Sequence, residues 1–226
     1  MCGRSSLTKT EKELEERFRA TFYSDDLERY NPLPNFNVAP TQMHPVITQE
    51  EPAIIHLYRW GLIPFWAKDI KIGSKLINAR IEGIDEKPSF RQAFQKRRCI
   101  VPFDGYYEWQ KTSEGKIPYR IQVKDVEIFT IAGLYEYWRN PEGKTIHSFT
   151  LITQEADPAI RHLHDRQPMI LMPDQEKLWL DPNLPSKDLI HELAPVTGSQ
   201  LTWYRVSDRV NKVTENDPGL IIPIEQ

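Results

Sequence analysis

Eighteen prolines, spread along the whole length of 226 residues, constrain this chain more than any other feature of its sequence. Proline lacks a backbone N–H and fixes φ, so regular elements must be short and separated by turns. The run 31–42 contains three prolines and is expected to be a loop. Apolar and β-branched runs predict short strands at residues 45–48, 53–60, 99–103, 106–109, 119–123, 127–134, 146–153 and 201–206.

Capping signals predict a few short helices between these strands. Thr10 and Glu13 form a capping box, so we expect a helix from about residue 9 to residue 20. Ser89 and Gln92 form a second box. Three more helices are expected to begin at Asp157 with Pro158, at Asp174 and at Ser186, the first of them ending near His164. The predicted strands and helices do not alternate regularly along the chain. They therefore indicate an α+β fold, mainly antiparallel sheet or a partly closed barrel, with short flanking helices.

The composition suits one globular domain over residues 1–226. Hydrophobic residues make up 39% of the chain, which is enough for a core. No apolar run reaches membrane-spanning length, and the charged stretch 9–19 does not fit a secretion signal. The cysteines Cys2 and Cys99 fit a reducing cytoplasm, and no CxxC or HExxH pattern suggests a metal. The cysteine usage therefore predicts a cytoplasmic protein, and we also expect a monomer without cofactors.

The charge balance bears on nucleic-acid binding. The net charge of -3 argues mildly against it, because such proteins usually carry a basic excess. A local basic groove remains compatible with this charge, since the potential depends on where the charges lie. Arg4 would share a site with Cys2, two residues away, whereas the basic run 96–98 is expected to be a solvated helix end.

The first residues carry the most reactive chemistry. Cys2 has a small side chain, which predicts removal of Met1 and a mature chain that begins at Cys2. Its amine and thiol would then lie on adjacent carbons, so they could trap an aldehyde as an imine and close a thiazolidine ring. Their free pKa values, about 8 and about 8.5, would need only modest tuning. Many chains begin Met-Cys by chance, so the pair alone does not establish this chemistry.

The segment WGLIPFW at 60–66 holds two tryptophans around a Gly and Pro turn. Trp60 adjoins a predicted strand and is expected in the core. Trp66 precedes a polar stretch and is expected on a loop, where an exposed ring could stack on a nucleobase or wedge into a base step. Burial in the core is the alternative for Trp66.

Asn78 and Arg80 are two residues apart, so on an extended segment both would face the same side. An amide beside a guanidinium suits an oxygen-rich ligand, because the guanidinium binds phosphate or carboxylate and the amide binds carbonyl or hydroxyl groups. The alternatives are a surface salt bridge for Arg80 and a turn role for Asn78.

Glu108 lies among aromatic residues on a predicted strand. Alternation places Tyr106 with Glu108 on one face, and Tyr107 with Trp109 on the other. A carboxyl in apolar surroundings has a raised pKa and suits general acid or base catalysis. The alternative, which the residues alone slightly favour, is an edge strand with Glu108 pointing to water.

His164 begins the polar cluster HDRQP and would lie at the C-terminal end of the helix predicted from Asp157. The negative end of the helix dipole would raise the pKa of His164 and make it a proton shuttle near neutrality. Ordinary core or surface roles are expected for His56, His147, His162 and His191.

In these residues the chain resembles the SOS-response-associated peptidase (SRAP) family of abasic-site processing proteins. The resemblance covers nearly the whole chain, and the order and spacing of the motifs make it specific. The matching stretches are MCGR at 1–4, NVAP at 37–40, WGLIPFW at 60–66, INAR at 77–80, RCIVPFDGYYEW at 98–109, HDRQP at 164–168 and, more weakly, VSDRVN at 206–211.

The resemblance implies a cytoplasmic, nucleoid-associated protein that binds single-stranded DNA at abasic sites and crosslinks to them through its N-terminal cysteine. It implies catalytic roles for Cys2, Asn78, Glu108 and His164. It places Arg4 and Arg80 at DNA phosphates, Trp66 at the bases near the lesion, and Asn37, Pro40 and Thr153 in the pocket lining. Some members of the family have a second aromatic residue directly after the one that matches Trp66, and this chain has Ala67 there. The difference affects how far the protein would stack on DNA bases, not whether it forms the crosslink.

In the expected reaction, Glu108 or His164 assists opening of the sugar, the Cys2 amine forms an imine, and its thiolate closes the ring. Asn78 orients the sugar oxygen or the N-terminus, and His164 also serves the reverse reaction. The imine would permit some β-elimination, hence weak lyase activity. Two alternatives stay open: an N-terminal-nucleophile peptidase that removes residues ahead of Cys2, and a non-covalent binder of single-stranded DNA.

Overall fold

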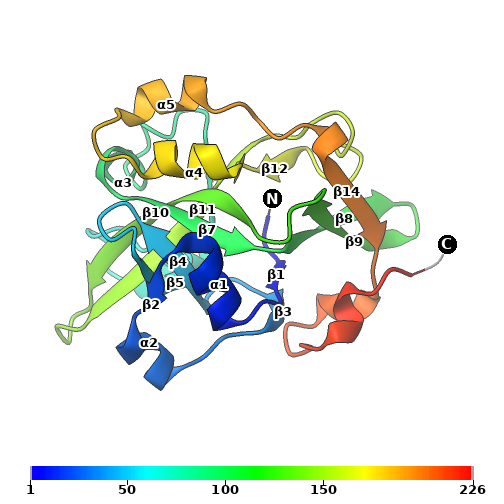
Figure 1. Cartoon of the computed structure of the whole chain (residues 1–226), viewed down its shortest axis with the longest axis horizontal. Helices are drawn as coiled ribbons and strands as arrows, with labels where there is room; N and C mark the ends of the chain where they lie inside the picture. The colour runs from blue at the N-terminus through cyan, green and yellow to red at the C-terminus, as the bar shows by residue number, and fades with distance from the viewer. Residues whose placement is uncertain (1, 225–226) are drawn as a thin grey trace.

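The computed structural model describes residues 2–224, without the side chain of Arg29, so the predicted removal of Met1 concerns a residue outside this range. Strands dominate the fold, and short helices lie around them (Figure 1). The strands are β1 (Ser5–Leu7), β2 (Thr21–Phe22), β3 (Asn35–Val38), β4 (Met43–Thr48), β5 (Ile54–Trp60), β6 (Asn78–Arg80), β7 (Arg98–Phe103), β8 (Gly105–Thr112), β9 (Gly115–Val123), β10 (Phe129–Arg139), β11 (Thr145–Glu155), β12 (Arg166–Pro168), β13 (Ile170–Leu171) and β14 (Leu201–Arg205). The helices are α1 (Glu11–Phe18), α2 (Ser24–Arg29), α3 (Arg91–Lys96), α4 (Pro173–Leu180) and α5 (Ser186–Glu192), with 3₁₀ turns at Ile70–Lys75, Gly198–Gln200, Asp208–Asn211 and Pro218–Ile221.

The strands of the described residues form two sheets. The larger runs in the order β12-β11-β10-β7-β4-β5-β2, with β13 on β10 and β6 on β11. Because β11 also pairs with β5, the strands β5, β4, β7, β10 and β11 close into a barrel. The smaller sheet has the order β14-β9-β8-β1-β3, and antiparallel pairs prevail in both. The predicted α+β fold with a mainly antiparallel, barrel-like core is confirmed.

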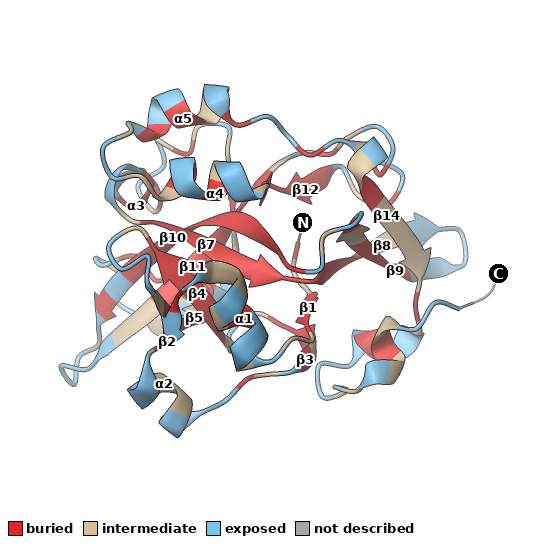
Figure 2. Cartoon of the chain, viewed as in Figure 1, coloured by how far each residue is buried: buried red, intermediate tan, exposed pale blue. Residues whose placement is uncertain are grey.

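The strands are mostly buried, whereas the helices expose one side to solvent (Figure 2). One apolar cluster lies under the helices and contains Leu14, Phe94 and Trp179. A second cluster, which includes Cys2 and Trp60, fills the barrel and extends to the smaller sheet. Truncating a large side chain in such a cluster costs about 3–5 kcal/mol, so both stabilise the frame that holds the N-terminal segment.

Every strand predicted from the sequence is present, and the capping box of Thr10 and Glu13 opens α1. The run 31–42 is not all loop, because β3 forms between its prolines, where strand ends tolerate them. The short elements β1, β2, β6, β12, β13 and α2 were not predicted, since two to six residues give too little periodicity.

Four of the predicted helix signals are wrong: the capping box at Ser89, the caps at Asp174 and Ser186, and the helix from Asp157. The box of Ser89 and Gln92 is absent, because α3 begins after Phe90 and has no side-chain cap there. The helices α4 and α5 form, but their caps are Met172 and Pro185. No helix follows Asp157. The next residues form successive turns instead, and Leu163 N, for example, donates to Ile160 O at 2.9 Å.

The prediction that the basic run 96–98 is a solvated helix end fails for Arg98, whose exposure is 1%. Its Nε donates to Trp179 O at 2.7 Å, its Nη1 to Ser186 Oγ at 2.6 Å, and its Nη2 to two further carbonyl oxygens. Ser186 Oγ in turn donates to the carbonyl oxygen of Phe94. The guanidinium therefore fastens the segment from α4 to α5 onto β7.

Candidate active site

Cys2 is fully buried and lies just before β1, whose label stands near the centre of the molecule in Figure 1. Asn78 on β6 donates from Nδ2 to the carbonyl oxygen of Cys2 at 2.8 Å. On the other side, Tyr107 N on β8 donates to Arg4 O at 2.9 Å, which joins the N-terminal segment to the smaller sheet. The backbone at Cys2 is thus held between β6 of the larger sheet and β8 of the smaller one.

Glu108 is 4% exposed, because β8 lies between β1 and β9 and is not an edge strand. The alternative of a solvent-facing Glu108 is therefore wrong. Alternation along β8 is confirmed: Tyr106 packs in the cluster of Cys2, whereas Tyr107 and Trp109 belong to a separate cluster. Burial raises the pKa of Glu108 to about 7, so at neutral pH this carboxyl can both give and take a proton.

The surroundings of Cys2 favour the neutral thiol over the thiolate. Burial raises the pKa of Cys2 well above its ordinary value, and the negative charge of Glu108 adds to the effect. The expectation that modest tuning would make this thiol reactive is thus not met by its surroundings. The electrostatic effect also indicates that the thiol and the Glu108 carboxylate lie close enough to interact.

His164 follows a series of turns rather than a helix, so the predicted increase of its pKa by a helix dipole is wrong; burial lowers the pKa of His164 instead. Its Nδ1 lies 2.9 Å from Arg166 N and 2.8 Å from Asp165 Oδ1. The backbone N–H requires an unprotonated Nδ1 and the carboxylate a protonated one. The presence or absence of a proton on Nδ1 therefore decides which contact forms.

Glu108 and His164 line the same pocket of about 550 Å³, together with Trp109, Lys111, Lys116 and Asn211. Lys111 on β8 lies directly opposite Lys116 on β9. Like charges in a cross-strand pair are destabilising, and an anion between them would remove that cost. Neither lysine was predicted as a site residue, although both flank the short β8–β9 turn that follows the GYYEW motif.

The residues that the family resemblance places at DNA lie on several different elements around the pocket of Glu108 and His164. Arg4 donates from Nη1 to Asn37 Oδ1 at 2.8 Å, and its guanidinium lies 5.9 Å from the centroid of the Trp109 ring. Arg4 and Asn37 thus adjoin the pocket of Glu108 and His164. Pro40 lies half-buried in the turn after β3.

Arg80 is exposed at the end of β6, opposite the buried Thr153 of β11. Arg166 donates from Nη2 to Thr153 O at 2.7 Å and forms two 2.8 Å bonds with the Glu82 carboxylate. This ion pair links the segment after Arg80 to the strand that follows His164.

The segment 61–67 is fastened to β10 and β11. Gly61 N donates to Phe149 O at 2.8 Å, Ile63 N to Ser148 Oγ at 2.8 Å, and Trp138 Nε1 to Ala67 O at 2.7 Å. As predicted, Trp60 is buried in the core and Trp66 is on a loop, 47% exposed.

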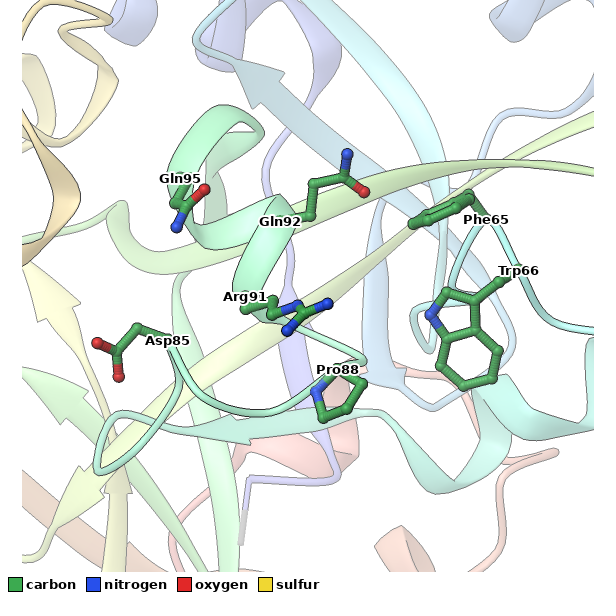
Figure 3. A pocket seen from close by; sticks show the side chains of 7 residues that line it. All are labelled: Phe65, Trp66, Asp85, Pro88, Arg91, Gln92 and Gln95. Atoms are coloured by element: carbon green, nitrogen blue, oxygen red, sulfur yellow. The ribbon is translucent and has the colours of Figure 1, made fainter.

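Trp66 and Phe65 line a hollow of about 900 Å³ across which Arg91 and Pro88 face them (Figure 3). The Arg91 guanidinium points toward Trp66 in this view. This hollow has other lining residues than the pocket of Glu108 and His164, so the two are separate features of the surface.

Within residues 2–224, no group of three or more His, Cys, Asp or Glu side chains could hold a metal ion. None of the helices in that range has the length and apolar character needed to cross a bilayer.

The chain belongs to the family described as SOS response associated peptidase (SRAP), whose model matches residues 1–213. It is 40% identical over 224 residues to the abasic site processing protein YoqW of Bacillus subtilis (strain 168), covering 98% of this chain and 99% of that relative. It is 28% identical over 270 residues to the abasic site processing protein HMCES of Xenopus tropicalis, covering 99% of this chain and 78% of that relative. A crystal structure of a protein from Bacteroides thetaiotaomicron matches with a TM-score of 0.91 at 30% identity, covering 99% of this chain and 100% of the other.

Proposed function

We propose that this protein processes abasic sites in single-stranded DNA by forming a thiazolidine crosslink through Cys2, and that it acts in the cytoplasm as a monomer on nucleoid DNA. The observation that carries the proposal is the meeting of Cys2, Asn78 and Glu108 in one buried site. The names of the relatives, abasic site processing proteins, support the same substrate.

The reaction requires removal of Met1, because the nitrogen of Cys2 in the encoded chain is an amide nitrogen and not a nucleophile. After removal, Glu108 or His164 transfers the proton that opens the deoxyribose to its aldehyde. The free amine adds to C1′, and loss of one water gives the imine. The Cys2 thiol then gives its proton to Glu108 while sulfur bonds to C1′, and the proton ends on the ring nitrogen.

The Glu108 carboxyl suits both proton transfers, since a group with a pKa of about 7 is present in both forms near neutrality. The high pKa of the buried Cys2 thiol makes a base at the moment of attack necessary. Asn78, which already binds the backbone of Cys2, orients the N-terminus or the sugar oxygen, and His164 also protonates the ring in the reverse reaction.

Binding of the strand in this proposal combines phosphate contacts with stacking. Arg4 and Arg80 hold phosphates, and the opposed pair Lys111 and Lys116 adds positive charge at the pocket. Trp66 stacks on a base, which only an unpaired strand offers freely. Asn37, Pro40 and Thr153 keep the pocket-lining roles that the family resemblance implies.

The decisive experiment is the intact mass of the protein after incubation with an oligonucleotide that carries one abasic site. We expect a product with the mass of the chain without Met1 plus the DNA minus one water. Undamaged DNA and a tetrahydrofuran site, which has no aldehyde, serve as controls and should give no adduct. Absence of the adduct with abasic DNA, in protein shown to begin at Cys2, would overturn the proposal.

The same preparation tests the alternatives. An N-terminal-nucleophile peptidase could retain some hydrolysis as Cys2→Ser, whereas the sulfur ring could not form; Met1 retained in Cys2→Ser but lost in wild type would indicate self-processing. A non-covalent binder predicts no shifted band on denaturing gels. Lyase activity through the imine predicts cleaved strands in addition to the adduct.

A further inference from the structure

Tyr106 is a site residue that the motifs do not assign. It lies two residues before Glu108 on β8, so both side chains leave the same face of the strand. Its side chain is fully buried, and within residues 2–224 its hydroxyl has no hydrogen-bond partner. A buried hydroxyl without a partner destabilises a fold, so an unpaired one calls for an explanation.

The adjacent tyrosine provides the contrast. Tyr107 is equally buried on the opposite face of β8, and its hydroxyl donates to Phe36 O at 2.7 Å. The fold thus supplies an acceptor for one of two neighbouring phenols and leaves the other without one. The difference lies in what each ring faces rather than in depth of burial.

Tyr106 belongs to the part of the fold that contains the reactive groups. It packs in the same cluster as Cys2, and its hydroxyl is within electrostatic reach of both Cys2 and Glu108. Burial raises the pKa of Tyr106 well above its ordinary value, so the phenol keeps its proton and can donate it in a hydrogen bond. Asn78 Oδ1 is likewise buried without a partner in the described range, which leaves one donor and one acceptor available near Cys2.

We propose that Tyr106 is a further catalytic residue of the crosslinking reaction, whose hydroxyl donates a hydrogen bond to the oxygen on C1′ of the opened sugar. This inference rests on the proposed function. When the Cys2 amine adds to C1′, the N–C bond forms, the π bond of the carbonyl breaks, and its electron pair moves onto oxygen. The amine proton ends on that oxygen, which later leaves as water, while Tyr106 keeps its own proton. A donor positioned at such an oxygen stabilises the transition state.

The test is Tyr106→Phe in single-turnover crosslinking at saturating abasic DNA. We expect the rate to fall by roughly tenfold to a hundredfold. Stability in urea should stay the same or rise, because the variant removes only an unpaired hydroxyl. The matched control is Tyr107→Phe, which removes the bond to Phe36 O and should lower stability while leaving the crosslinking rate unchanged.

A binding measurement separates chemistry from recognition. A tetrahydrofuran site lacks the C1′ hydroxyl that becomes the carbonyl oxygen of the opened sugar, so wild type and Tyr106→Phe should bind it equally. If wild type crosslinks and Tyr106→Phe does so at the same rate, the role of Tyr106 is overturned and the proposed function stands. A slower variant that is also less stable, or that binds the tetrahydrofuran site less tightly, would likewise overturn it. If wild type itself forms no adduct, it is the proposed function that fails.

Discussion

Two buried polar regions of this molecule differ in how completely they are satisfied. At Arg98, each of the three guanidinium nitrogens donates to an acceptor of the fold. Around Cys2, the buried oxygens Asn78 Oδ1 and Tyr106 Oη have no partner within residues 2–224. In the region of Arg98 these hydrogen bonds stabilise the fold. In the region of Cys2 the unpaired oxygens are left to form hydrogen bonds with a bound ligand.

The largest effect should come from the centre of the region of Cys2. Cys2→Ala removes the sulfur that closes the ring, and crosslinking should fall by roughly a thousandfold or more, as when a nucleophile is lost. Stability in urea should change little, because the side chain is small. Intact mass and denaturing gels measure the adduct; a stable adduct formed by Cys2→Ala would show that the sulfur is not needed.

The region of Arg98 should respond in the opposite way. Arg98→Leu leaves buried acceptors without a donor and should lower the free energy of unfolding by about 3 kcal/mol or more. The crosslinking rate of the folded fraction should not change. Lys96→Leu, at an exposed neighbouring position, is the control and should stay within about 0.5 kcal/mol of wild type. A loss of crosslinking in folded Arg98→Leu would mean that the two regions are coupled.

Ionisation of Glu108 should make both the free energy of unfolding and the crosslinking rate depend on pH. Its folded pKa of about 7 exceeds the ordinary value of about 4.3, so the folded state binds the proton more tightly. Stability therefore falls as pH rises from about 4 to about 7, and the ionised carboxylate costs up to roughly 3 kcal/mol above that range.

Glu108→Gln removes this cost, so the variant should gain stability relative to wild type at pH 8.5 but not at pH 4. Its crosslinking at pH 7 should be slower, because the amide cannot accept the thiol proton. Urea unfolding at both pH values measures the first effect. A stability difference independent of pH would contradict the raised pKa.

The smallest of these effects should come from Trp66, which lies outside both buried regions. Trp66→Ala removes a stacking platform and should weaken binding of single-stranded DNA by about 1–3 kcal/mol. Stability should not change, since the ring is 47% exposed. Fluorescence anisotropy with a tetrahydrofuran-containing strand measures binding without the crosslink. Unchanged affinity would remove Trp66 from the interface.

The sequence predicted the strands that carry strong apolar alternation and the capping box of α1, because these signals are local. It could not predict β1 or β6, which are three residues long and exist only because β8 and β11 pair with them. Motifs placed Cys2, Asn78 and Glu108 in one site, and the structure brings these three together.

The failures have different origins. The pKa of His164 was predicted from a helix that does not form. The burial of Arg98 depends on carbonyl groups of a segment more than eighty residues away along the chain. The unpaired hydroxyl of Tyr106 was also invisible, because no sequence pattern reports a missing partner.

The hydrogen bond from Asn78 ends on the carbonyl oxygen of Cys2, on the side away from residue 1. Cutting the peptide bond between residues 1 and 2 therefore leaves this tether in place. The amine that trimming exposes belongs to a residue whose position is already fixed. Removal of Met1 would then generate the amine nucleophile in the position where it reacts. A flexible chain end would not have to be ordered first, so the entropy cost of ordering it would be avoided.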